Sequence, residues 1–279
     1  MANRLAMPRG ILRFRCSVGT MRDEPAALRG EAADLVTTRG FYAFDGPRGR
    51  YDLVFSVEDM SKNYVQTGPT MSSSVLPVMS QRLATDGTKT LFDLISLTAD
   101  RKALGHSFNL DTGVDQFHRN KLMIPLQLGE AKVRTGLAAD LDAALKPDSG
   151  CHLVAVDERA HEDGVAVTML TFEADGERRQ YAVDLARGAV PRSIRSTSLD
   201  PKTPYENLTR HDDITRVAGK AWLPLRHTYM SKPGPFTQLV IEDIDLVKPV
   251  PDSIYAMDFP EPRVLVDATT LLRHAERTT

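Results

Sequence analysis

Residues 165–198 read VAVTMLTFEADGERRQYAVDLARGAVPRSIRSTS. Runs rich in apolar and β-branched residues alternate here with the short breaks Asp175-Gly176 and Arg187-Gly188. Such runs, separated by two-residue turns that contain glycine, are typical of antiparallel β-hairpins. The stretch therefore predicts consecutive antiparallel strands, and the same pattern continues on both sides of it.

Alternating apolar and polar residues predict strands through most of the chain. The expected strands cover residues 11–18, 34–44, 50–57, 77–84, 88–96, 151–156, 205–217, 222–230 and 236–247. Between Leu97 and Gly150 the alternation is lost, and GLAADLDAALK at 136–146 is the one credible helix. Its leucines, Leu137, Leu141 and Leu145, stand four residues apart and should pack onto the sheet as a stripe.

This order of elements predicts a mainly β protein with a few helices, of the α+β class. We expect one large curved antiparallel sheet with helices on one face, because helices do not alternate with strands as they do in doubly wound folds. We also expect a single domain over residues 1–279, with the strands before Leu97 and after Gly150 in one sheet. Residues 263–279 should form a tail with a short helix.

The composition excludes several classes of protein. With 42% hydrophobic residues, 26% charged residues and a net charge of −2, the chain is globular and lacks the basic footprint of a nucleic-acid-binding protein. No stretch approaches the ~20 apolar residues of a transmembrane segment. No secretion signal is visible at the N-terminus, so the protein is expected in the cytoplasm unless a leader is missing from this numbering. Cys16 and Cys151 are expected to be unpaired, buried thiols.

The densest polar cluster is His211-Asp212-Asp213. Neighbouring residues on a strand point to opposite faces, so these side chains should not share a metal ion. His152, Asp157, His161 and Asp163 form a looser set around a probable bend, which ordinary turn chemistry explains.

No complete catalytic or cofactor motif is present. The chain lacks a Gly-x-Ser-x-Gly elbow, a dinucleotide fingerprint, a phosphate-binding loop and a His-Glu-x-x-His motif. The sequence therefore favours a binding or carrier protein over an enzyme, and predicts no cofactor and no metal.

Several phrases resemble one superfamily. YAVDLARGAVPRSIR at 181–195, VAGKAWLPLRHTYM at 217–230 and PVPDSIYAMDFPEP at 249–262 are similar in order and turn chemistry to the LolA/LolB-type lipoprotein carriers, particularly the outer-membrane-lipoprotein-sorting-like members. FYAFDGPRGRYDLVF at 41–55 and LATDGTKTLFDLIS at 83–96 resemble the paired early strands. The resemblance covers about residues 10–262.

The resemblance implies an incomplete, curved barrel whose open, concave side is covered by helices, with acyl chains held between them. It also implies the periplasm or cell envelope, a lipid or lipoprotein acyl chain as ligand, and an envelope protein as a further partner. Strand alternation makes the following residues candidates for the apolar cavity: Leu53, Phe55, Phe92, Leu94, Val167, Met169, Leu239 and Ile241. Replacing Phe55 or Met169 with Asp should then weaken uptake of a fluorescent fatty acid.

Two alternatives remain at this point. The first is a protein-protein interaction module, whose concavity is filled by side chains and which docks its partner through an edge strand or through the polar segment from Ser61 to Ser74. The second is a hydrolase with dispersed site residues around His211 or His227. An apolar pocket of several hundred Å³ between sheet and helices would favour the carrier over the interaction module.

Overall fold

The structure is a computed structural model. It describes residues 9–20, 36–46, 48–54, 78–85, 90–97, 103–110, 136–219, 221–232, 235–256 and 264–267. The polar segment from Ser61 to Ser74 and the candidate residue Phe55 lie outside these residues.

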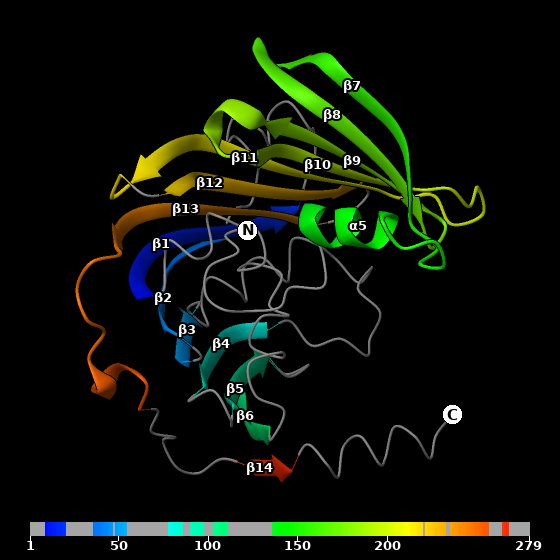
Figure 1. Ribbon diagram of the computed structural model, residues 1–279. Helices are drawn as coiled ribbons and strands as arrows, with labels where there is room; N and C mark the ends of the chain where they lie inside the picture. Colours follow the sequence, from blue (N-terminus) through cyan, green and yellow to red (C-terminus); the bar gives the residue numbers. More distant parts are fainter. Residues whose placement is uncertain are drawn as a thin grey trace. The chain divides into compact units, whose positions relative to one another are not determined.

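Strands make up most of the described chain (Figure 1). They are β1 (Arg9–Thr20), β2 (Val36–Asp45), β3 (Arg48–Val54), β4 (Val78–Thr85), β5 (Thr90–Leu97), β6 (Ala103–Leu110), β7 (His152–Glu162), β8 (Val165–Ala174), β9 (Glu177–Asp184), β10 (Val190–Ser198), β11 (Glu206–Val217), β12 (Ala221–Lys232), β13 (Pro235–Asp245) and β14 (Val264–Asp267). The α-helix α5 (Leu137–Ala144) and the 3₁₀ turns η3 (Leu185–Arg187) and η4 (Asp252–Ile254) complete them.

The chain divides into two compact units. Unit 1 consists of Met1–Ala6, Val18–Leu35 and Lys132–Val240, and unit 2 consists of Met7–Ser17, Val36–Ala131 and Ile241–Thr279. The single domain expected from the sequence therefore stays a prediction.

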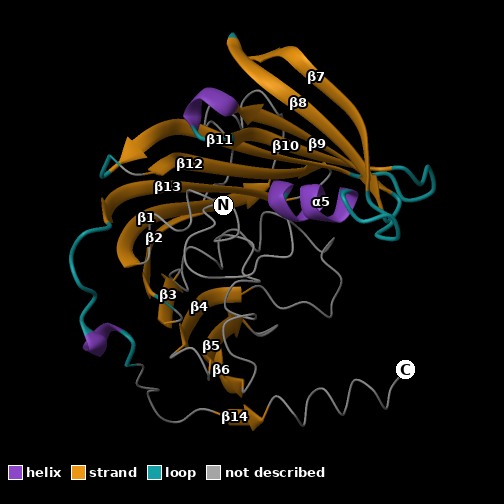
Figure 2. Ribbon diagram, in the orientation of Figure 1, coloured by secondary structure: helices purple, strands orange, loops and turns teal. Residues whose placement is uncertain are grey.

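Unit 1 contains antiparallel strands in the order β12-β11-β10-β9-β8-β7, with the part of β13 up to Val240 beside β12. The strands twist and curve (Figure 2). β7 ends the order of the described strands, so among them this sheet has a free edge and is not closed into a barrel.

Unit 2 contains the order β14-β6-β5-β4-β3-β2-β1. The pairs from β2 to β6 are antiparallel, and β14 pairs with β6 in parallel. The predicted fold class, mainly β with antiparallel pairing, is confirmed, and α5 is the only α-helix among the described residues. Two details differ from expectation: β6 forms where the alternation seemed lost, and Val264–Asp267 form a strand where a helical tail was expected.

Apolar and charged residues alternate along β1, and the apolar ones form part of the core of unit 2. Leu12, Phe14 and Cys16 are fully buried, while Arg13 and Arg15 between them are exposed. This is the half-buried strand that the sequence predicts, with one face toward the core. Cys16 is a free thiol, as Cys151 is in unit 1.

The core of unit 1 lies between α5 and strands β8 and β9. Its buried residues are Cys151, Phe172, Ala174, Tyr181 and Val183, and α5 adds Leu137, Ala143 and Ala144. Of the leucine stripe predicted for the helix, Leu137 packs against the core, but the prediction is wrong for Leu141 and Leu145, which are 37% and 83% exposed. Asp140 faces the sheet instead and is only 5% exposed, since the sheet supplies polar partners for it.

Candidate functional site

A buried carboxylate ties α5 to the sheet of unit 1. Arg179 donates from Nη1 to Asp140 Oδ1 at 2.5 Å, and the Tyr181 hydroxyl donates to Asp140 Oδ2 at 2.6 Å. Both carboxylate oxygens are therefore satisfied, as burial of a charge requires. Burial and the hydrogen bond to Asp140 raise the pKa of Tyr181, so its hydroxyl keeps the proton that it donates. The helix is thus held in one position on the sheet.

Beside α5, the free edge of the sheet presents apolar side chains to solvent. Leu153 pairs with Phe172 and Val156 pairs with Leu170 across β7 and β8, so all four lie on the face that α5 covers. Phe172 is buried in the core, but Leu153 is 42% exposed and Val156 is 52% exposed. We call Leu153, Val156 and the partly buried Leu170 the apolar strip.

The apolar strip continues the core out to the edge of the sheet. Two further apolar side chains near it in sequence are exposed, Val154 at 48% and Leu141 of α5 at 37%. Single exposed leucines and valines are normal on a protein surface, but a group that extends a core is typical of a binding surface. An alkyl chain lying along β7 would remove these side chains from water.

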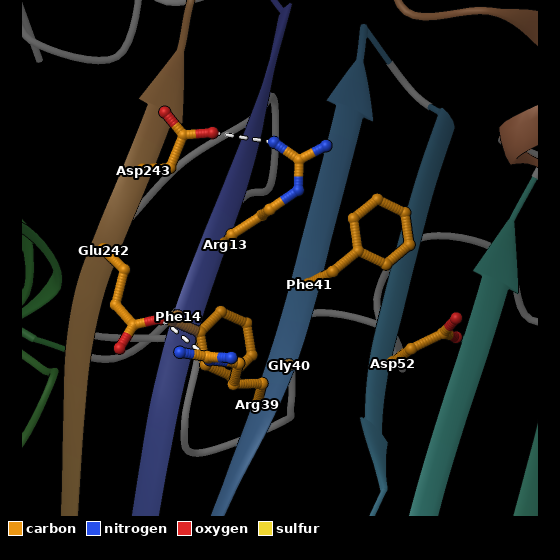
Figure 3. A pocket seen from close by; sticks show the side chains of 8 residues that line it. All are labelled: Arg13, Phe14, Arg39, Gly40, Phe41, Asp52, Glu242 and Asp243. Atoms are coloured by element: carbon orange, nitrogen blue, oxygen red, sulfur yellow. Dashed lines mark hydrogen bonds and ion pairs between the residues drawn. The ribbon is translucent and has the colours of Figure 1, made fainter.

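Unit 2 carries a groove of different chemistry (Figure 3). Its volume is about 490 Å³, and it is lined by Arg13, Phe14, Arg39, Gly40, Phe41, Asp52, Glu242 and Asp243. Arg13 Nη1 lies 2.7 Å from Asp243 Oδ2, and Arg39 Nε lies 3.2 Å from Glu242 Oε2.

The groove in unit 2 is not the apolar cavity of a lipid carrier. Its arginines are already paired, and their side chains are 64% and 83% exposed at Arg13 and Arg39. Exposed pairs of this kind contribute at most about 1 kcal/mol each. They join β1 and β2 to the acidic residues of β13, so the simplest role of this face is a solvated surface of the sheet.

The residues predicted to line a cavity, apart from Phe55, lie in different parts of the described structure. Leu53, Val167, Leu239 and Ile241 are buried, and Met169 is half-buried. Phe92 and Leu94 belong to β5, where they pair with Leu83 and Gln81 of β4.

The register separates some of these residues. Met169 is aligned through Ala182, Ser193, Arg210 and Thr228 with Gln238. The next residue of β13, Leu239, is therefore on the opposite face of the sheet from Met169. Val167, two residues before Met169, shares its face, while Ile241 belongs to unit 2. The ligand-binding role of the eight residues stays a prediction.

Two buried histidines lie next to each other in unit 1. His211 and His227 are directly paired across β11 and β12, both 3% exposed, with ring centroids 5.1 Å apart. His211 Nδ1 lies 2.5 Å from the Pro191 carbonyl oxygen, which can only accept, so this nitrogen carries the proton. His211 Nε2 and His227 Nδ1 are buried and make no hydrogen bond within the described structure.

Burial lowers the pKa of His211 and places the pKa of His227 well below its ordinary value, where His211 also contributes. The pair is therefore neutral at physiological pH. Within the described ranges no group of three or more His, Cys, Asp or Glu residues could hold a metal ion, and two neutral ligands would not compensate a buried dication.

The carboxylates of Asp212 and Asp213 pair with arginines and not with His211. This agrees with the expectation that neighbouring residues on a strand point to opposite faces. Asp212 accepts from Arg210, and Asp213 is exposed and pairs with Arg226.

The looser polar set of His152, Asp157, His161 and Asp163 is exposed throughout. Asp157 accepts from the backbone N–H of Arg159, and His161 Nδ1 lies 3.0 Å from the Arg159 carbonyl oxygen. Local turn contacts account for both residues.

The apolar strip was not predicted from the sequence. Its signal was the run Leu153-Val154-Ala155-Val156, which places apolar residues on successive positions instead of alternate ones. Such a run fits a strand with apolar residues on both faces. No helix of the described residues is long and apolar enough to cross a membrane.

Comparison with known proteins gives structural likeness only. No family model matches the chain, and no curated protein matches its sequence. A Vibrio parahaemolyticus domain described as an outer membrane lipoprotein-sorting protein covers 88% of both chains, with a TM-score of 0.42 and 9% identity. A DUF1329 family protein from Desulfovibrio piger covers 90% of both chains, with a TM-score of 0.38 and 7% identity. At such identities no residue role carries over from either protein.

Proposed function

We propose that this protein is a non-enzymatic carrier or sensor that binds an acyl chain or another apolar ligand, in the cell envelope. The observation that supports this proposal is the apolar strip beside α5. A helix fixed by a buried carboxylate covers one part of the sheet face, and the neighbouring part leaves Leu153 and Val156 half open to water.

The strip suits a ligand that must be released again. Each methylene removed from water contributes about 0.8 kcal/mol, so a chain that buries about six methylenes gains about 5 kcal/mol. That free energy corresponds to a dissociation constant of roughly 0.2 mM. The strip alone therefore gives weak, reversible binding.

A fluorescent fatty acid tests the proposal directly. Val156→Glu places a charge on the strip, whereas Ala155→Glu places the same charge on the opposite face of the same strand, opposite Thr171. We expect Val156→Glu to weaken fatty-acid uptake at least fivefold and Ala155→Glu to leave it unchanged. Equal effects of the two variants would refute the strip as the binding surface. Met169→Asp then reports whether the other face takes part.

Native mass spectrometry of gently purified protein provides the second test. We expect co-purified lipid that is lost from the Val156→Glu variant. If neither lipid nor acyl-probe uptake is found, the interaction module becomes the better function, because the strip would then serve a protein partner.

One feature of β7 already weighs against docking by strand addition. The register of β7 shifts between Leu153 and Ala155 and again between Asp157 and Ala160. Such bulges blunt an edge strand against pairing with another chain. A ligand that contacts side chains fits this edge better than an added strand.

A further inference from the structure

The far end of the β7–β8 hairpin extends beyond the strand that supports it. Pairing between β8 and β9 stops at Thr168 and Val183, whereas β7 and β8 stay paired as far as Glu162 and Val165. Figure 1 shows the hairpin diverging from β9 toward its tip. We call residues 158–167 the overhang. Its two strands pair only with each other among the described residues.

The overhang closes in a tight turn. Asp163 and Gly164 have φ angles of 49° and 77°, as both central residues of a type I′ turn require. The turn holds Asp163 at the tip of the hairpin, where its side chain is 53% exposed.

One side chain joins this tip to the rest of unit 1. Arg210 of β11 donates from Nη2 to Asp163 Oδ2 at 2.5 Å and to Asp212 Oδ1 at 3.2 Å. Within the described ranges this is the only hydrogen bond between two side chains that leaves the overhang, and the Arg159 backbone N–H also donates to the neighbouring Asp157. Because Arg210 and Asp212 lie on the same face of β11, the tip bends over that face.

The face shared by the end of the overhang and the sheet next to it is largely buried and carries small or apolar side chains. Val167 is 4% exposed, and its neighbour on the same face, Met169, is aligned with Ala182 and Ser193, which are 0% and 7% exposed. This is the face of Arg210, because Ser193 pairs with Arg210. Lifting the overhang would therefore expose Val167 and Met169, two residues that the sequence predicts for ligand binding.

Opening would cost little, for two reasons. Arg210 keeps Asp212 as a partner when Asp163 leaves, so no charge is stranded. Glu162 Oε2 is buried without a hydrogen-bond partner in the described structure, and opening would hydrate it. The gain at Glu162 offsets part of the exposure of Val167, which is the condition for two states of similar free energy.

We propose that the overhang is a flap that opens at the bulge between Asp157 and Ala160 and at the end of the β8–β9 pairing, with Arg210 as its latch. The flap uncovers Val167 and Met169 on the face of the sheet opposite to the apolar strip. The flap does not depend on the proposed carrier function, because all the contacts that define it are between residues of this protein.

Hydrogen–deuterium exchange read by mass spectrometry tests the flap on the intact protein. In Arg210→Gln, we expect the amides of residues 158–167 to exchange about two- to fivefold faster, the effect of losing one partly exposed ion pair. Residues 169–174, which stay paired with β9, should be unchanged. Wild type in 1 M NaCl should move toward the variant, because salt screens the pair.

Two further variants make the result decisive. Asp163→Asn removes the same latch from an exposed position and should reproduce Arg210→Gln. Arg226→Gln removes a comparable exposed ion pair, to Asp213 at 3.2 Å, and should leave the overhang unchanged. The flap is refuted if Asp163→Asn has no effect on residues 158–167, if Arg226→Gln has the same effect, or if residues 169–174 accelerate equally. Fatty-acid uptake is not part of this test, so its failure and that of the carrier function are distinguishable.

Discussion

Replacing Asp140 with Asn should loosen α5 from the sheet. The carboxylate is 5% exposed and receives Arg179 and the Tyr181 hydroxyl on its two oxygens. An amide removes the charge that balances Arg179 and places an NH2 group, which can only donate, where an accepting oxygen is needed. Breaking a buried pair typically costs about 3–5 kcal/mol.

The cost at Asp140 should lie below that range. The Arg179 side chain is 20% exposed and keeps a second carboxylate, Glu177, at 3.1 Å. Water and Glu177 therefore stabilise the guanidinium that Asp140 leaves behind. We expect Asp140→Asn to lower the free energy of unfolding by about 2–3 kcal/mol after this correction, which corresponds to roughly 5–10 °C in Tm.

Urea unfolding followed by circular dichroism measures this effect, with Asp142→Asn as the matched control on the exposed side of the same helix. The midpoint should fall for Asp140→Asn with an unchanged m-value, and should barely move for Asp142→Asn. If the two variants unfold at the same urea concentration, the buried carboxylate does not hold the helix on the sheet.

Two further predictions concern the buried core. Burial lowers the folded-state pKa of both His211 and His227 below the unfolded value of about 6.5, so the unfolded state binds more protons below that pH. Stability should therefore be full above pH about 6.5 and fall as the pH drops, by up to about 1.4 kcal/mol per pH unit for each histidine. His227→Gln should remove part of that slope in urea titrations between pH 7.5 and 5, and an unchanged slope would contradict the role of the pair. In unit 2, a Cβ at Gly40 would lie 2.4 Å from the Phe14 ring, so Gly40→Ala should cost about 1–3 kcal/mol by overpacking. A thermal melt shows this as a lower Tm, and a Tm equal to wild type would mean that the ring moves freely.

Local pattern was enough to predict most of the strands, although not β6 and β14. β1 follows its alternation residue by residue, and both early hairpins form where Gly-containing turns separate apolar runs. Period-2 alternation works here because each such strand has one buried face, so burial and sequence repeat together. The separation of His211 from Asp212 followed from the same geometry.

The contacts that define the candidate site depended on the tertiary structure. No spacing rule pairs Asp140 with Arg179 and Tyr181, because the helix reaches them across 39 and 41 residues of chain. The leucine spacing of the helix instead predicted that Leu141 and Leu145 are buried. Both are exposed, because Asp140 of α5 faces the sheet to reach Arg179 and Tyr181 on β9. The sequence by itself determined most of the strand segments, since a strand with one buried face is marked by neighbours one or two residues away. Which apolar residues stay open to water was decided only by the tertiary structure, where β7 ends the strand order and no described element covers Leu153 and Val156 completely.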